Sequence, residues 1–190
     1  MLGQTHAGTR PVRVLVVGDS VSAALGYEPS LETGIAKGLD VKFDLEVCRR
    51  LATAGCPYAG HVPSSALDVV ERDARGTDVL VVDVGYNDDP AVYGEAMEHV
   101  IRTAKSLGVK EIVWVNLRET RDLYRQTNAA IRTEARRNPG VQVADWNAWS
   151  AGRPWFRTDG LHLTDPGVQG LAVMLRVYIL SAARDAATTS

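Results

Sequence analysis

The chain has 190 residues, of which 45% are hydrophobic and 23% charged, and its formal net charge at pH 7 is −2. This length and apolar content suffice for one globular domain with a substantial core. We therefore expect a short N-terminal tail over residues 1–11 and a single domain over residues 12–187. The nearly balanced charge provides no basic field for a polyanion, which argues against nucleic acid as a partner.

No apolar stretch reaches the roughly 20 residues that a membrane-spanning helix needs. The most apolar late segment, residues 171–180, is short and contains Arg176. The opening residues MLGQTHAGTRPVR lack the apolar run of roughly 7–15 residues that marks a signal peptide. We expect no transmembrane segment in this chain and no signal peptide within the sequence as given.

Five short apolar runs, several of them rich in valine, predict β-strands. Continuously apolar runs such as VLVVDV are typical of strands that helices cover on both faces. The predicted strands span residues 12–17, 41–47, 79–84, 111–117 and 141–144.

Between these runs, apolar residues recur at three- and four-residue spacing, which predicts amphipathic helices. Alternating strands and helices favour a three-layer α/β/α sandwich with a central, mostly parallel five-stranded sheet. The predicted helices span residues 65–74, 90–107, 120–137 and 166–187.

Two cysteines, Cys48 and Cys56, follow the second predicted strand and lie eight positions apart. Two interpretations stay open. A disulfide would favour an extracytoplasmic location, whereas two reduced thiols would favour the cytoplasm. A metal site is not expected, because no nearby Cys or His completes a tetrahedral set.

Ligands of such folds bind beyond the carboxyl ends of the strands. Ser20 directly follows the first predicted strand, where a serine hydroxyl can act as a nucleophile if a base takes its proton. Asp159 and His162 are close enough in sequence for the carboxylate to orient the imidazole. An isolated serine here is more often a helix N-cap, so the prediction of catalysis rests on the combination. Asp19 and Asp88 are expected to accept hydrogen bonds from backbone amides in the turns.

The segments VVGDSV, GYND and DGLHLT occur in this order, and they resemble blocks I, III and V of the SGNH (GDSL-like) hydrolase family. The resemblance spans nearly the whole chain and implies a flavodoxin-like SGNH fold. It also implies Ser20 as nucleophile, Asp159 and His162 as the rest of a catalytic triad, and Asn87 as a side-chain donor to the oxyanion. The Ser20 amide is expected as a second donor, and no cofactor is implied.

Block II of the family supplies a glycine whose amide also donates to the oxyanion, and here the sequence departs from the pattern. Aligning VCRRLA with sugar-ester members places Cys48 at the glycine position. Gly55 is the alternative. A bridge between the two cysteines would stiffen this loop.

Two further side chains are candidates for substrate binding. Arg49, beside the predicted oxyanion site, can recognise a carboxylate or sugar hydroxyls, although a solvated arginine pair with Arg50 is the alternative. Trp155 belongs to an aromatic cluster ahead of DGLHLT that can line a pocket or cover an edge of the core.

These features predict a serine esterase or O-acyltransferase that acts on small acyl esters, such as acetyl esters of carbohydrate, through an acyl-Ser20 intermediate. Similarity to SGNH members that handle O-acetylated carbohydrates, including domains of cell-envelope acyltransferases, favours that substrate. A lipase or thioesterase of the same family is one alternative. A non-catalytic carbohydrate-binding module on the same fold is another.

Overall fold

The five predicted strands form one parallel sheet in the computed structural model, which describes residues 10–188. The strand order is β2-β1-β3-β4-β5, and each neighbouring pair is parallel. The predicted tail over residues 1–11 lies almost entirely outside the described residues. The strands are β1 (Arg13–Gly18), β2 (Asp40–Leu45), β3 (Val79–Asp83), β4 (Glu111–Val115) and β5 (Val141–Ala144).

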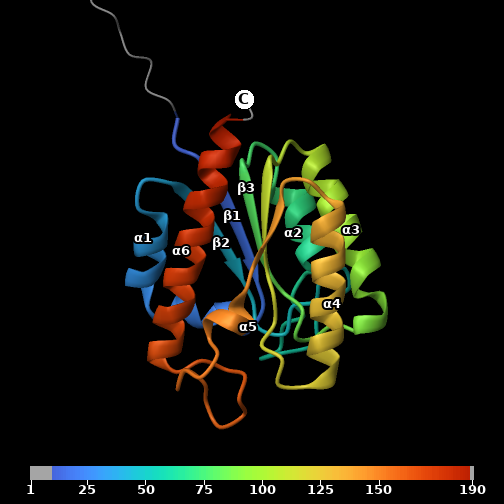
Figure 1. Cartoon of the computed structure of the whole chain (residues 1–190), viewed down its shortest axis with the longest axis vertical. Coiled ribbons are helices and arrows are strands. Elements are labelled where there is room, and N and C mark those ends of the chain that lie inside the picture. The colour runs from blue at the N-terminus through green and yellow to red at the C-terminus, as the bar shows by residue number, and fades with distance from the viewer. Residues whose placement is uncertain (1–9, 189–190) are drawn as a thin grey trace, which may run out of the picture.

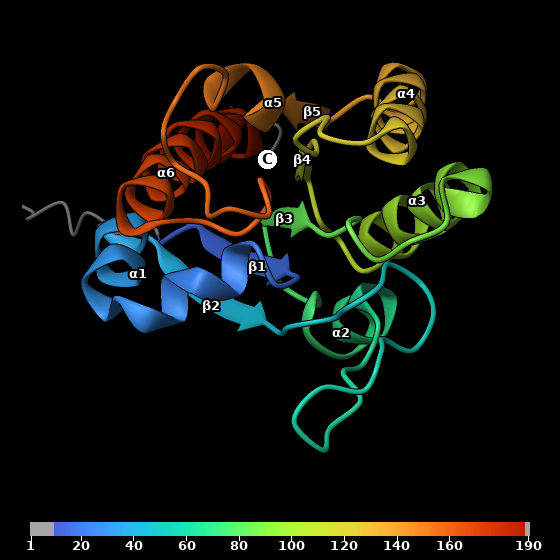
Figure 2. The same cartoon turned by 90° about the horizontal axis from the view of Figure 1, so that it is seen from below.

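Helices cover both faces of the sheet, as Figures 1 and 2 show, so the predicted α/β/α sandwich is confirmed. Alternate strand residues face opposite layers: Val14 and Val16 pack toward one set of helices, and Leu15 and Val17 toward the other. The first layer holds the 3-10 helix η1 (Ser22–Tyr27), α1 (Pro29–Ala36), α5 (Trp146–Trp149) and α6 (Asp165–Thr188). The second holds α2 (Ala66–Asp73), α3 (Pro90–Ser106) and α4 (Asp122–Arg137).

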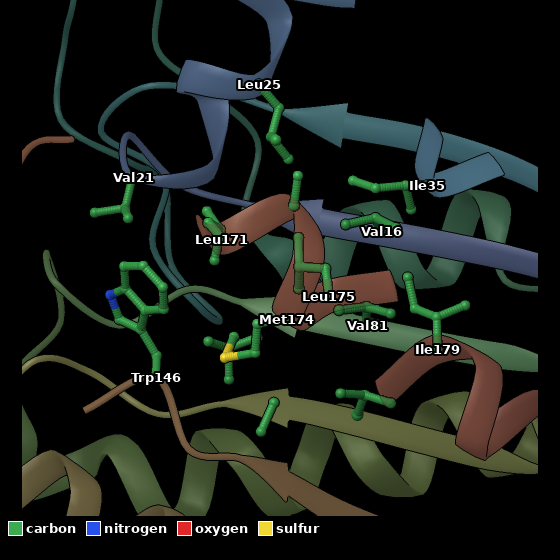
Figure 3. Close-up of a cluster of buried hydrophobic side chains, with 14 of the residues drawn as sticks. Val16, Val21, Leu25, Ile35, Val81, Trp146, Leu171, Met174, Leu175 and Ile179 are labelled. Carbon is green, nitrogen blue, oxygen red and sulfur yellow. The ribbon is translucent and has the colours of Figure 1, made fainter. Parts of the chain in front are cut away.

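Helix α6 is the main covering element of the first layer, and its apolar side chains meet those of β1 and β3 in the core shown in Figure 3. By length and composition alone α6 could cross a membrane, but 56% of its most apolar window is buried inside this fold. The Arg176 guanidinium donates to the carbonyl oxygens of Ile35 and Lys37, which fixes α1 against α6. These contacts give α6 the environment of a core helix.

The carboxyl ends of all five parallel strands meet at one edge of the sheet, the lower edge in Figure 1 and the one facing the viewer in Figure 2. The loop that precedes α6 lies at the same edge. The turns after β1 and β3 and the DGLHLT segment are therefore brought together, although the chain separates them widely.

Candidate active site

Ser20 lies in the turn between β1 and η1, half-buried at the carboxyl edge of the sheet. The strand ends at Gly18, where a Cβ would collide with the Ser22 hydroxyl and come within 2.8 Å of Leu45. A glycine is required at this position because the chain turns tightly against β2 and η1. The serine hydroxyl is thus presented by a closely packed turn.

Asp19 ties this turn to the turn after β3. Its fully buried carboxylate accepts hydrogen bonds from the Val21 amide at 3.0 Å and from the Gly85 and Tyr86 amides at 3.3 Å each. Asp88 accepts from the Leu51 amide at 2.9 Å. Both aspartates therefore bind backbone amides, as the sequence predicts.

A second buried carboxyl group, Asp83, lies behind the nucleophile turn, and no sequence pattern distinguished it. Strand pairing places Asp83 opposite Gly18, and the Asp83 carbonyl oxygen accepts from the Asp19 amide at 3.0 Å. Burial raises the pKa of Asp19 to about 6, and burial together with the charge of Asp19 raises the pKa of Asp83 to about 8.

Asp159, His162 and Ser20 form a chain of side-chain contacts. His162 Nδ1 lies 2.7 Å from Asp159 Oδ2, and His162 Nε2 lies 3.3 Å from Ser20 Oγ. The other carboxylate oxygen of Asp159 accepts from the amides of Leu161 and His162, at 2.8 and 3.0 Å. This is the geometry in which a carboxylate orients an imidazole that can accept a serine proton.

The Asp159 carboxylate is held in its charged form. The hydrogen bond from His162, followed by the Leu161 amide, lowers the pKa of Asp159 to about 2. Its side chain is 46% exposed and that of His162 is 45% exposed, so this side of the site is open to water. The carboxylate therefore remains ionised at neutral and mildly acidic pH.

The loop that carries Asp159 and His162 is a narrow hairpin. Phe156 pairs with Leu163 in an isolated antiparallel bridge, and the Arg157 amide donates to the His162 carbonyl oxygen at 2.8 Å. Arg118, from the end of β4, lies 3.6 Å above the Phe156 ring and donates to the Gly160 carbonyl oxygen. Sequence analysis missed Arg118, because no motif relates it to a loop some 40 residues later.

Trp155 does not reach the cleft, which corrects the expectation that it binds substrate. Its ring stacks on Trp146 and packs on α6, where a Cβ at Gly170 would come within 2.6 Å of the indole. Its carbonyl oxygen accepts from the Thr164 amide at 2.9 Å. Trp155 therefore anchors the base of the hairpin to α6.

Three residues that line the cleft, Ser20, Cys48 and Asn87, can each supply an N–H donor. Asn87, in the turn after β3, uses one N–H of its amide to donate to the Arg49 carbonyl oxygen at 3.1 Å, which leaves a second N–H for a ligand. Within residues 10–188, neither the Ser20 amide nor the Cys48 amide donates to a protein acceptor. All three residues line the same cleft.

Cys48 and Cys56 form a disulfide in the structure, with their Cα atoms 5.3 Å apart. Of the two interpretations that the sequence left open, the structure therefore has the disulfide. Gly55, the alternative to Cys48 as oxyanion donor, gives its amide to the Pro63 carbonyl oxygen at 3.1 Å and lies outside the cleft lining. Of the two candidates, only Cys48 lines the cleft and has an amide without a protein acceptor within residues 10–188.

Arg49 is fully buried, which corrects the expectation that its side chain contacts substrate. Its guanidinium binds the Asp44 carboxylate at 2.6 Å and donates to the carbonyl oxygens of Gly18 and Ser64. A charged group that is fully buried is stable only when it is paired and hydrogen-bonded. Arg49 therefore holds the loop after β2 against β1.

The cleft at this edge has a volume of about 870 Å³. Its floor includes Ser20 and Tyr86, and its rim includes two tyrosines, Tyr27 and Tyr58, whose side chains are 82% and 56% exposed. Within the described part of the chain, no cluster of three or more His, Cys, Asp or Glu side chains has a geometry that could hold a metal ion.

Comparison with solved structures relates this architecture to known esterases. A psychrotrophic esterase, EstA from Pseudoalteromonas sp., matches 91% of this chain and 97% of its own, with a TM-score of 0.61 and 12% identity. A putative GDSL-like lipase from Bacteroides ovatus matches 93% of this chain and 55% of its own, with a TM-score of 0.65 and 16% identity. An aryl esterase of M. smegmatis has a TM-score of 0.60 and 13% identity, over 90% of this chain and 99% of its own. The chain has the SGNH hydrolase fold.

Sequence comparison finds relatives among curated proteins. Putative O-acetyltransferases from several Staphylococcus aureus strains, including MSSA476 and N315, are 26% identical over 162 residues, 84% of this chain. The matched region is 24% of those proteins, so the chain corresponds to about a quarter of their length. No family model matches the chain.

Proposed function

We propose that this domain is a serine esterase or O-acyltransferase that forms an acyl-Ser20 intermediate. The contact chain from Asp159 through His162 to Ser20 carries the proposal. A base alone does not make a catalytic serine, because the developing oxyanion also needs donors. Ser20, Cys48 and Asn87 line the same cleft, and within residues 10–188 the amides of Ser20 and Cys48 and one N–H of Asn87 have no protein acceptor.

Acylation follows from this geometry. Ser20 Oγ attacks the carbonyl carbon of the ester while His162 Nε2 takes its proton, and the carbonyl oxygen becomes an oxyanion between the three donors. The ionised Asp159 stabilises the resulting imidazolium. When the tetrahedral intermediate collapses, the bond to the alcohol oxygen breaks, the imidazolium returns its proton to that oxygen, and the acyl group remains on Ser20.

Deacylation repeats the same steps with a new nucleophile. His162 takes a proton from water or from an acceptor hydroxyl, whose oxygen attacks the acyl carbonyl carbon. Collapse returns that proton to Ser20 Oγ and releases either the carboxylic acid or a new ester. Hydrolysis and transfer therefore share one intermediate and differ in which hydroxyl reaches it.

We assign the alcohol portion of the substrate to carbohydrate and the acyl group to a small one such as acetate. A cleft of about 870 Å³ is far larger than an acetyl group. The exposed rings of Tyr27 and Tyr58 at its rim offer apolar faces with a hydroxyl at the tip, which suits the mixed surface of a sugar. The relatives named as putative O-acetyltransferases support the acetyl group.

The experiment is release of p-nitrophenol from p-nitrophenyl acetate by the wild type, by Ser20→Ala and by the matched control Ser106→Ala, an exposed serine at the end of α3. Each reaction is run with and without a short chito-oligosaccharide. We expect turnover by the wild type and the control only, and acetylated oligosaccharide among the products identifies a transferase. Equal turnover by Ser20→Ala would refute the proposal and favour a binding module.

The carbohydrate assignment has a separate test. Tyr27→Ala and Tyr58→Ala should raise KM for an acetylated oligosaccharide severalfold and leave p-nitrophenyl acetate kinetics nearly unchanged. Trp149→Ala, an aromatic side chain that is 38% exposed and outside the cleft lining, is the control. A long-chain p-nitrophenyl ester that is preferred over acetate would instead indicate a lipase or thioesterase.

A further inference from the structure

The backbone of Cys48 adopts a left-handed conformation, with φ at 70°. Among the described residues only Cys48 and Ala59 do so without being glycine. A Cβ disfavours this region, so a residue other than glycine stays there only when its surroundings hold it. Cys48 also lines the cleft that contains Ser20, and within residues 10–188 its amide donates to no protein acceptor.

Cys48 is held from two sides. On one side its neighbour Arg49 is fixed by its buried guanidinium and by the hydrogen bond from Asn87 to its carbonyl oxygen. On the other, the disulfide ties the Cys48 side chain to Cys56, whose amide donates to the Cys48 carbonyl oxygen at 3.2 Å.

Gly55 lets the two cysteines approach this closely. A Cβ at Gly55 would lie 2.5 Å from the Cys48 carbonyl oxygen and would collide with the Pro63 ring. The glycine therefore allows the loop to close tightly around residue 48.

We propose that the disulfide between Cys48 and Cys56 is a positioning device for the oxyanion site. It keeps residue 48 left-handed, so that its amide remains available to the oxyanion alongside Asn87. Without the bridge, residue 48 relaxes toward negative φ and its peptide planes rotate away from the cleft. Cys56 is thus a positioning residue that touches no substrate. This inference rests on the proposed function.

Two double variants that both lack the bridge separate the backbone effect from the loss of the cross-link. Cys48→Ala/Cys56→Ser keeps a Cβ at residue 48, whereas Cys48→Gly/Cys56→Ser removes it, and glycine enters the left-handed region readily. We expect kcat of the alanine variant to fall about 5- to 30-fold, the population penalty that the left-handed region imposes on a residue with a Cβ. The glycine variant should recover most of that loss, and KM should change little in either.

The single variant Cys56→Ser should behave like the alanine double variant. Val62→Ala, an exposed residue in the same loop and outside the cleft lining, should keep wild-type kcat and so controls for general disturbance of the loop. Thiol titration of the denatured wild type should detect no free thiol. Equal kcat for the glycine and alanine variants, or wild-type kcat for Cys56→Ser, would overturn the proposal.

Crystal structures of the two double variants give a readout that does not depend on turnover. We expect negative φ at residue 48 with alanine and positive φ with glycine. Positive φ with alanine would show that the bridge does not hold this conformation and would overturn the proposal even if the wild type proved inactive. Inactivity of the wild type with the expected change in φ would refute the proposed function alone.

Discussion

On each side of the cleft an aspartate carboxylate binds backbone amides, but one carboxylate is buried and the other is nearly half exposed. On the nucleophile side, the turn that carries Ser20 is fixed by the fully buried carboxylate of Asp19, which binds amides from two strand ends. On the base side, Asp159 and His162 are nearly half exposed and are oriented mainly by hydrogen bonds within their own hairpin. Substitutions on the first side should affect folding and activity together, whereas those on the second should affect activity alone.

The largest effects should come from the reacting groups. Ser20→Ala and His162→Ala should each lower kcat/KM by about 1000-fold or more, measured with p-nitrophenyl acetate. Because His162 is exposed, His162→Ala should leave the melting temperature almost unchanged. His99→Ala, an exposed histidine on α3, serves as the control. A His162→Ala variant that keeps its activity would exclude His162 as the base.

Asn87 lies on the nucleophile side, and its replacement tests the proposed oxyanion site. Asn87→Ala should lower kcat by roughly 100- to 1000-fold, the usual effect of losing one such donor. It should also lower the melting temperature by a few degrees, because the bond to the Arg49 carbonyl oxygen is lost. An effect on KM alone would mean that Asn87 binds the substrate in its ground state.

Asp159→Asn tests the base side more subtly. We expect kcat to fall about 10- to 100-fold, because the imidazole loses the partner that fixes its tautomer while water replaces part of the interaction. In the wild type, the Asp159 pKa of about 2 keeps this carboxylate ionised at neutral and mildly acidic pH, so it continues to orient the imidazole throughout that range. Full activity at neutral pH would replace the triad with a dyad of Ser20 and His162.

The buried carboxyl groups predict how stability depends on pH. The pKa of Asp83 is raised to about 8 in the fold, whereas an unfolded aspartate titrates near 3.9. Its contribution to the free energy of unfolding is therefore fully present below about pH 4 and is lost as pH rises toward 8. Asp83→Asn cannot ionise, so between pH 5 and pH 8.5 it should lose less stability than the wild type, by at least about 1 kcal/mol.

Urea denaturation at the two pH values measures this difference. Asp40→Asn, an exposed aspartate at the start of β2, should keep the wild-type dependence. Parallel curves for the wild type and Asp83→Asn would show that Asp83 does not titrate in this range.

The smallest expected effect on activity comes from replacing Arg118, whose side chain contacts the hairpin that carries Asp159 and His162. Arg118→Ala removes the contact with the Phe156 ring and the bond to the Gly160 carbonyl oxygen. We expect kcat/KM to fall about 3- to 10-fold as the hairpin samples other positions. Faster hydrogen exchange in residues 156–163 should accompany this loss. Arg125→Ala, which loses only an exposed pair with Asp122, is the control.

Sequence patterns predicted the strands, and placed Ser20, Asp159 and His162 together, for physical reasons. Continuous β-branched runs identify buried parallel strands, and residues directly after them must lie at one edge of the sheet. The spacing of Asp159 and His162 is local, so their contact was readable from the chain. The short helices η1, α1 and α5 were not assigned, because each offers too few buried residues for a helical pattern; α1 buries only Ile35.

What the sequence could not reveal depends on contacts between distant residues. The burial of Arg49 requires carbonyl oxygens from β1 and from the loop before α2. Asp19 and Asp83 lie close together because of the register in which β1 pairs with β3. Trp155 is directed to α6 by glycines that follow it in the chain. None of these contacts has a local signature.

The most direct test of the central claim is to look for the acyl group on Ser20. Wild type and His162→Ala are mixed with p-nitrophenyl acetate, quenched in acid, and digested for peptide mass spectrometry, with Ser20→Ala as the reference. The account predicts an acetyl group on the peptide that contains Ser20 in the wild type and none in Ser20→Ala. Wild-type protein that turns over the ester while its acetyl group resides on another residue would contradict it.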